Sequence, residues 1–311
     1  MTPDPLDDTT ASEPAAPPPP PPPPIPASAP PIPAQPWRGG RVAAGITCVL
    51  APNPSGMTLD GTNTWLLHRP EGREAALVDP GPLDDGHAQA IVAAARRAGV
   101  RITLVLLTHG HDDHTESAEH VARLVGAPLS FPGQHQAARR DAGEPLDLPG
   151  HDVDGLRIEA IPTPGHTHDS VCFWLPQQRA LLTGDTILGR GTTVVTWPDG
   201  ALAPYLASLA RLRELCARED VEVLLPGHGH PVRPAARALA VIDYYVAHRH
   251  ERLDQVRAAL DAAGVDSVPG PQAPGFGDVV EQVVRTVYAD APREVWPAAR
   301  QSVRAQLEYL R

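Results

Sequence analysis

The 311-residue chain contains no lysine, and all 26 of its basic residues are arginine. Arginine binds phosphate and carboxylate groups through a planar fork of donors, so an arginine-only chain would suit anionic ligands. The accompanying abundance of alanine, proline and glycine instead indicates a compositional bias of the coding sequence. The absence of lysine therefore predicts no mechanism by itself.

Cysteine is also scarce, and the three present, Cys48, Cys172 and Cys216, are far apart. None has C-x-x-C spacing, so neither a disulfide framework nor a thiolate zinc finger is indicated. The chain lacks a basic start followed by an apolar stretch, and nowhere do 18 apolar residues follow one another. We therefore expect no signal peptide, no membrane span and a cytoplasmic protein.

Proline is concentrated at the N-terminus, where 16 of 38 prolines fall within residues 1–36, including the run 17–24. Polyproline lacks hydrogen-bond donors and stays extended and solvated, so residues 1–36 are predicted to be a disordered tail. An SH3-like partner is one hypothesis for this tail, and a simple spacer is the other. The tail carries four acids and no arginine, which leaves 33 acids and 26 arginines in the remainder of a chain with net charge −11. This balance is not typical of a protein that coats nucleic acid.

Beyond the tail, short apolar runs alternate with amphipathic stretches, which predicts an α/β domain over residues 37–234. Strands are expected at residues 65–68, 75–78, 102–107, 156–161, 180–182 and 221–225, and helices at 86–98, 116–125 and 202–217. After residue 234 only helical patterns remain: a long helix through Leu260, one over 278–288 and one near 297–310. Residues 235–311 are therefore predicted to form a small helical domain.

Three histidines and two aspartates follow one predicted strand in the segment T-H-G-H-D-D-H at residues 108–114. An H-x-H pair in a loop can place both rings on one side, and the following D-H can turn toward a second point nearby. Neutral imidazole and carboxylate suit Zn²⁺ and neighbouring first-row metals. Two metals need about seven ligands, and this segment offers His109, His111, Asp113 and His114.

Three further ligands are expected at the ends of other strands. The candidates are His166 in P-G-H-T, Asp185 in T-G-D-T and His228 in P-G-H-G, where glycine permits a sharp turn. Any one of these residues alone is consistent with an ordinary loop residue, but all seven in this order predict a dinuclear site. His230 is interpreted as an exposed loop residue and His168 as a spare polar residue near the mouth of the site.

The pattern T-H-x-H-x-D-H, G-H-T, G-D and P-G-H-G, with an earlier strand that ends in D-P-G, resembles the metallo-β-lactamase fold superfamily. The resemblance implies a four-layer αββα sandwich over about residues 41–234, with the metals at one edge between two sheets. It implies a first metal on His109, His111 and His166, and a second on Asp113, His114 and His228. It also implies that Asp185 bridges both metals and that Asp79 orients the metal-binding loop.

The resemblance implies two Zn²⁺ ions as cofactors, with Mn²⁺ or Fe as alternatives. A bridging aspartate such as Asp185 is typical of the thioesterases, dioxygenases and phosphodiesterases of the superfamily rather than of its true β-lactamases. A metal pair can share a bridging hydroxide as nucleophile and stabilise the developing oxyanion. Asp113 is the expected catalytic residue, which would orient this nucleophile or accept its proton.

Further segments are similar to the group typified by beta-lactamase-like protein 2. These are N-P at residues 53–54, T-L-D-G-T-N-T-W at 58–65, G-D-T-I-L-G-R-G-T-T at 184–193 and H-R at 248–249. That resemblance implies a C-terminal winged-helix-like domain and endoribonuclease cleavage of single-stranded RNA, although fungal polyketide thioesterases share much of the pattern. Arg190, Thr192 and Arg249 are candidate substrate contacts. Arginines 190, 249 and 252 lining the approach to the metals would favour a phosphate substrate.

Four functions are consistent with these residues. Hydrolysis of single-stranded RNA by a dinuclear zinc enzyme is the first hypothesis. Hydrolysis of thioesters of glutathione, coenzyme A or a carrier protein is the second, and the acidic charge balance tolerates it better. A sulfur dioxygenase with one iron on His109, His111 and His166 is the third. A non-catalytic binding module is the fourth, and it would leave a complete ligand set without a use.

Overall fold

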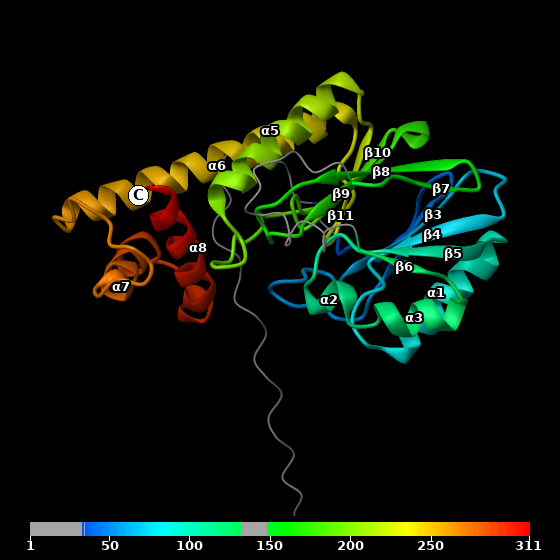
Figure 1. Cartoon of the computed structure of the whole chain (residues 1–311), viewed down its shortest axis with the longest axis horizontal. Helices are drawn as coiled ribbons and strands as arrows, with labels where there is room; N and C mark the ends of the chain where they lie inside the picture. Colours follow the sequence, from blue (N-terminus) through cyan, green and yellow to red (C-terminus); the bar gives the residue numbers. More distant parts are fainter. Residues whose placement is uncertain (1–32, 34, 132–147) are drawn as a thin grey trace, which may run out of the picture.

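A computed structural model of the chain describes residue 33, residues 35–131 and residues 148–311 (Figure 1). Most of the tail predicted over residues 1–36 lies outside these residues. The described part holds two β-sheets with helices on their outer faces and a group of helices at the C-terminus (Figure 1). None of its helices is long and apolar enough to cross a bilayer.

Six strands form the first sheet in chain order. They are β1 (Gly40–Ala43), β2 (Ile46–Leu50), β3 (Asn63–His68), β4 (Glu74–Val78), β5 (Arg101–Leu106) and β6 (Leu129–Ser130). Five strands form the second sheet in the order β11 (Val223–Pro226), β10 (Ala180–Gly184), β9 (Val171–Leu175), β8 (Leu156–Pro162) and β7 (His151–Val153). The pairs β4–β5, β5–β6 and β10–β11 are parallel, so their carboxyl ends lie at the same edge of each sheet.

The core follows from the alternation of side chains along each strand. Trp65 and Leu67 of β3 face the second sheet and pack with Ile158 and Phe173 in the buried cluster between the sheets. Leu66, the residue between them, faces the opposite way and packs with helices α1 (Asp85–Ala98) and α3 (Ala118–Val125). The outer face of the second sheet packs against α5 (Leu202–Arg218) and α6 (Ala235–Ala262). The result is the four-layer αββα sandwich that the family resemblance implied.

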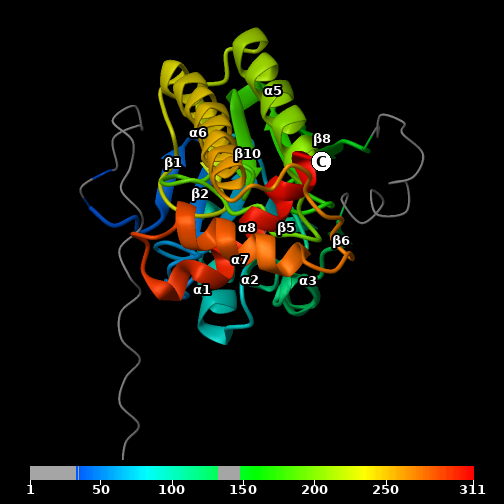
Figure 2. The same ribbon diagram turned by 90° about the vertical axis from the view of Figure 1, so that its left-hand side faces the viewer.

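The C-terminal part is helical, as the sequence predicts. Helix α6 packs its first half on α5, and its last turns join α7 (Phe276–Val287) and α8 (Trp296–Tyr309) in a separate apolar cluster (Figure 2). Two short 3₁₀ turns, η1 (Pro176–Gln178) and η2 (Arg293–Val295), complete the described helices together with α2 (Asp112–Thr115). One continuous helix thus belongs to both the sandwich and the C-terminal group.

The sequence patterns located six of the eleven strands and missed β1, β2, β6, β7 and β9. The strand β9 is buried at all five positions, so it has no polar alternation to mark it. The strands β6 and β7 have two and three residues, which is too short for a periodic signal. Each sheet nevertheless holds three strands that the patterns reveal, so the predicted α/β layout is unchanged.

Candidate metal centre

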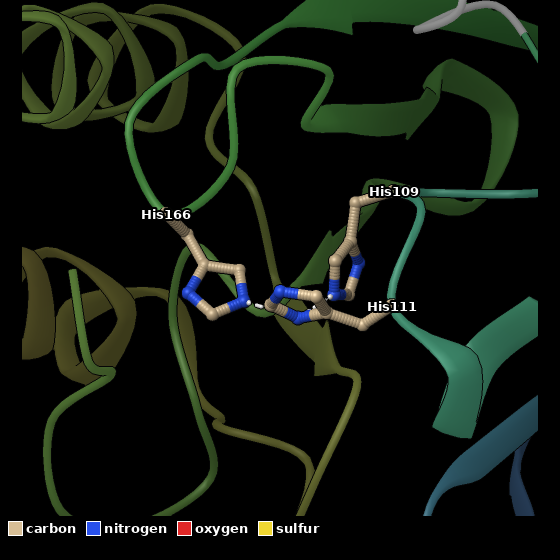
Figure 3. A group of neighbouring side chains, drawn as sticks. All are labelled: His109, His111 and His166. Carbon is tan, nitrogen blue, oxygen red and sulfur yellow. Dashed lines mark hydrogen bonds between the residues drawn. The ribbon is translucent and has the colours of Figure 1, made fainter. Parts of the chain in front are cut away.

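Three imidazoles converge where the loop after β5 meets the loop between β8 and β9 (Figure 3). His111 Nδ1 lies 3.0 Å from His109 Nε2 and 3.1 Å from His166 Nε2. A tetrahedral zinc with bonds of about 2.0–2.1 Å separates its ligand nitrogens by roughly 3.3 Å, which is close to these distances. We call these residues the histidine trio, and their ligand atoms lie within 4.8 Å of one another.

A second set of ligand atoms belongs to Asp113, His114 and His228. His228 Nε2 lies 3.2 Å from His114 Nε2 and 3.1 Å from Asp113 Oδ2. Asp113 and His114 lie in the short helix α2, and His228 lies two residues after the end of β11. These three residues form the aspartate trio, which also satisfies the geometry of a group that could hold a metal.

Asp185 lies between the two trios. Its Oδ2 is 3.3 Å from His228 Nε2 and 3.8 Å from His166 Nε2, and its Oδ1 is 3.5 Å from His114 Nε2. The Oδ1 atom is buried and has no hydrogen-bond partner among the described residues. Because a buried carboxylate oxygen without a partner is costly, this atom fits a site built for a cation. The structure therefore brings all seven predicted ligands together, in overlapping groups that could hold a metal ion.

Three of the histidines, His109, His166 and His228, are held with the proton on Nδ1. His166 Nδ1 donates to Val194 O at 2.7 Å, and His228 Nδ1 donates to Gly61 O at 3.2 Å. His109 Nδ1 lies 3.0 Å from the hydroxyl of Thr108. A proton on Nδ1 leaves the lone pair of Nε2 free to ligate, and in each case Nε2 faces the centre.

Asp79 fixes both halves of the segment 108–114. Its Oδ1 accepts the backbone N–H of Thr108 at 2.8 Å, and its Oδ2 accepts the Thr108 hydroxyl at 2.7 Å. The same Oδ2 accepts Nδ1–H of His114 at 2.9 Å. Asp79 is 1% exposed, so solvent does not compete for these bonds, and its carboxylate joins Thr108 to His114.

Two residues outside the predicted set position His228. The side-chain amide of Asn63 donates to Pro226 O at 2.9 Å and to Gly229 O at 2.8 Å, which holds both ends of the P-G-H-G turn. A Cβ on Gly227 would lie 2.3 Å from Asp185 Oδ1 and 2.7 Å from His114 Cε1. Only glycine leaves room there for the ligands. Asn63 occupies the first, buried position of β3, and apart from its place in the segment 58–65 nothing in the sequence marks it as a site residue.

The carboxylates dominate the electrostatics around His228, whereas burial lowers the pKa of His109 and of His166. Burial acts to lower the pKa of His228, but Asp185 and Asp113 overcome it and raise that pKa to about 10. Burial acts to raise the pKa of Asp185, but His228 and His114 hold it well below its usual range. The same negative field that favours imidazolium favours a divalent cation in its place.

Two of the three candidate substrate contacts have other partners. Arg190 forms an ion pair with Asp60, and Thr192 is half-buried two residues further on. Arg249 is 5% exposed, and its Nη2 donates to Thr193 O at 2.5 Å. This placement corrects the expectation that Arg249 is available to a substrate, because protein covers nearly all of it.

Other residues named from the sequence also have defined places. Arg252 lies over the ring of Tyr288 at 5.3 Å and donates to Gln255. His168 forms a pair with Asp199 and is 30% exposed. His230 is half-buried against Trp37 rather than exposed, with ring centroids 5.4 Å apart, because Trp37 covers that side of the turn.

Two segments of the chain match known protein families. Residues 57–228 match the metallo-beta-lactamase superfamily, and residues 280–311 match the beta-lactamase associated winged helix domain. The first match covers more than half of the chain, and the chain belongs to the metallo-β-lactamase superfamily. It is a hydrolase of that superfamily with a C-terminal helical winged-helix domain, and the superfamily typically binds divalent metals.

Particular relatives extend over most of the chain. A beta-lactamase-like protein 2 homologue from Caenorhabditis elegans is 31% identical over 87% of this chain and 85% of its own. An atrochrysone carboxyl ACP thioesterase from Aspergillus chevalieri is 31% identical over 82% of this chain and 77% of its own. A solved metallo-beta-lactamase family protein from Thermus thermophilus shares the fold with a TM-score of 0.62, at 22% identity over 86% of this chain and 93% of that one.

Proposed function

We propose that this chain hydrolyses acyl thioesters at a pair of divalent metal ions, with zinc as the first expectation. The histidine trio and the aspartate trio would each hold one ion, and Asp185 would contact both. Bound ions would supply Lewis acidity at the acyl carbonyl and lower the pKa of a water molecule held between them. A complete aspartate trio favours two ions over the single iron of a sulfur dioxygenase.

Asp113 is the proposed catalytic carboxylate. Its side chain is 30% exposed, whereas that of Asp185 is 10% exposed, so Asp113 is the carboxylate that an incoming water reaches. It would accept or orient the proton of the attacking water. Its Oδ2 is held 3.1 Å from His228 Nε2, which keeps the carboxylate directed at the centre.

The choice of substrate rests on one observation, which is that the candidate arginines are paired or buried. Cleavage of RNA requires cations that can reach phosphates, and single-stranded RNA also favours exposed aromatic platforms. Arg190 is paired with Asp60, and Arg249 is buried. An acyl carbonyl is uncharged and needs no such groove. The 31% identity to a named ACP thioesterase supports the same choice.

Cleavage of single-stranded RNA is the second candidate. The 31% identity to a beta-lactamase-like protein 2 homologue and the C-terminal winged helix domain support it. The two hypotheses share one metal centre and differ in what reaches it, so they are separated by substrate and not by metal content.

The test offers thioesters and RNA side by side to the same metal-loaded protein. Zinc-loaded protein and manganese-loaded protein are each given an acyl-glutathione, an acyl-coenzyme A and a labelled single-stranded RNA. We expect release of free thiol with intact RNA, and loss of that activity in Asp185→Ala. RNA cleavage with intact thioesters would reject the thioester proposal in favour of the second candidate. One iron per chain and oxygen consumption would reject hydrolysis altogether.

A further inference from the structure

We infer that Arg249 is a positioning residue that holds His166 in the histidine trio through the segment Thr193–Val194. The inference rests on the candidate metal centre and is independent of which substrate is cleaved. It assigns a role at the metal centre to the helix that the sandwich shares with the C-terminal domain.

The first step is the contact between Arg249 and the segment. Arg249 lies near the middle of α6, and its Nη2 donates to Thr193 O at 2.5 Å. Its guanidinium also lies over the ring of Tyr205 from α5, with Cζ 5.0 Å from the ring centroid. These two contacts fix the peptide between Thr193 and Val194 against two helices.

The second step is the contact between the segment and the ligand. Val194 O accepts Nδ1–H of His166 at 2.7 Å, and the Thr193 hydroxyl lies 3.1 Å from the same nitrogen. Both oxygens belong to a stretch without helix or strand, between β10 and α5. Without an external anchor, the direction of these oxygens would vary, and the Nε2 lone pair of His166 would vary with them.

The third step concerns the free-energy cost of burying the Arg249 guanidinium. Arg249 is 5% exposed, its Nε has no hydrogen-bond partner, and no carboxylate pairs with it among the described residues. A buried guanidinium without a counter-ion contributes little to folding, and an apolar side chain of similar volume is often tolerated in its place. A role in stability alone therefore does not account for this residue.

Two neighbouring tyrosines also anchor the stretch between β10 and α5, which begins at Asp185 and leads to Thr193. Tyr205 donates its hydroxyl to Thr186 O at 2.7 Å, and the Tyr245 hydroxyl accepts Leu188 N–H at 2.9 Å. Both tyrosines are fully buried and come from α5 and α6. Arg249 is the member of this set whose anchored segment bonds directly to a predicted metal ligand.

The experiment measures the metal affinity of each trio separately. His228→Ala disables the aspartate trio, and His166→Ala disables the histidine trio. Arg249→Met is added to each background and to the full-length protein, and Zn²⁺ is titrated against a competing chelator. The control is Arg257→Met, which removes an exposed arginine of the same helix that pairs with Asp254.

We expect Arg249→Met to weaken zinc binding about 10- to 100-fold in the His228→Ala background. In the His166→Ala background we expect zinc affinity to change less than about threefold. The histidine trio is then already disabled, and the contacts of the segment Thr193–Val194 described above are with His166. The metal-free Tm should change by no more than about 4 °C. Nitrogen NMR of the histidine rings should show a loss of the Nδ1–H tautomer at His166, which a purely structural role would not produce.

Equal weakening in both backgrounds with a large fall in metal-free Tm would overturn the inference, as would unchanged binding in both. Should Arg249→Met fail to fold, Arg249→Lys decides the matter, because it keeps the charge but lacks the planar guanidinium that reaches Thr193 O while lying over the Tyr205 ring. A lysine that folds and shows the same selective weakening supports the positioning role, and one that binds zinc like the wild type refutes it. None of these measurements uses turnover, so they stand whether the enzyme cleaves thioesters or RNA.

Discussion

Replacement of Asp79 by asparagine tests how the segment 108–114 is organised. Asp79 accepts three hydrogen bonds, and its Oδ2 takes two of them, from the Thr108 hydroxyl and from His114 Nδ1. An asparagine has one oxygen, so whichever way the amide is turned, an N–H group faces at least one of these donors. The backbone at this position has φ of +53°, which asparagine tolerates, so the substitution changes the side chain alone.

The magnitude follows from the bond to His114. Loss of a charge-assisted hydrogen bond between buried groups costs about 1.5–3 kcal/mol of stability. An amide N–H next to Nδ1 also favours the tautomer with its proton on Nε2, which cannot ligate. Such changes behind a metal ligand weaken binding about 10- to 100-fold, equivalent to about 1.4–2.7 kcal/mol.

The assay is zinc titration of metal-free protein together with urea unfolding. Asp85→Asn is the matched control, because it makes the same chemical change on a side chain that is 85% exposed. We expect Asp79→Asn to weaken one zinc step and to lower the free energy of unfolding, with Asp85→Asn close to wild type. Two zinc steps of wild-type affinity in Asp79→Asn would refute the reasoning about the tautomer.

Three further predictions concern single residues. Gly227→Ala should lower activity about 100-fold, because its Cβ would displace Asp185 and His114 from positions 2.3 and 2.7 Å away, and turnover of the test substrates measures this. Asp185→Ala should lower metal occupancy and abolish activity, as measured by metal analysis and turnover, because Asp185 contacts both trios. Burial and the nearby Arg249 and Arg252 lower the pKa of His248 to about 3. His248→Gln should therefore reduce the loss of stability in acid. Urea unfolding at pH 7.5 and at pH 5.5 measures this loss.

The sign of the His248 effect is fixed by proton uptake. Above pH 6.5 the imidazole is neutral in both states, and below it only the unfolded chain takes up the proton. Stability should therefore fall as the pH drops from 6.5 toward 3, by up to about 1.4 kcal/mol per pH unit. A wild-type chain and a His248→Gln variant with the same pH dependence would contradict this.

The other two predictions have their own controls. Gly277→Ala adds a methyl group to α7 where nothing lies within 4 Å, so it should leave activity unchanged and not destabilise the protein. Wild-type activity in Gly227→Ala would show that the ligands are less crowded than the distances imply. Near-normal turnover in Asp185→Ala would contradict a site that uses both metals.

The candidate metal ligands were predictable from the sequence. The residues that position those ligands through hydrogen bonds were not. Histidine and aspartate at strand ends indicate metal ligands by their type and spacing. Asn63, Thr108 and Thr193 act through hydrogen bonds to carbonyls and ring nitrogens that only the fold brings near. Their side chains are common in loops and strands, so no local pattern distinguishes them.

Arg249 was predicted to be a candidate substrate contact, and the structure places it inside the protein. The spacing of α6 held the signal, because Tyr245, Arg249, Leu253 and Val256 fall on one buried face at helical intervals. A charged residue on an apolar stripe is a sign of a buried polar contact. The layered fold was more robust, since the fully buried strand β9 pairs on both sides with strands that their own patterns reveal.

The most direct test of the account is the position of metal in crystals of the zinc-loaded protein, located by anomalous scattering. We predict two zinc peaks per chain. One should lie within about 2.0–2.2 Å of the ligand atoms of His109, His111 and His166. The other should lie beside Asp113, His114 and His228, with Asp185 between the two. A single peak at either trio, or zinc bound elsewhere with both trios vacant, would contradict the dinuclear centre.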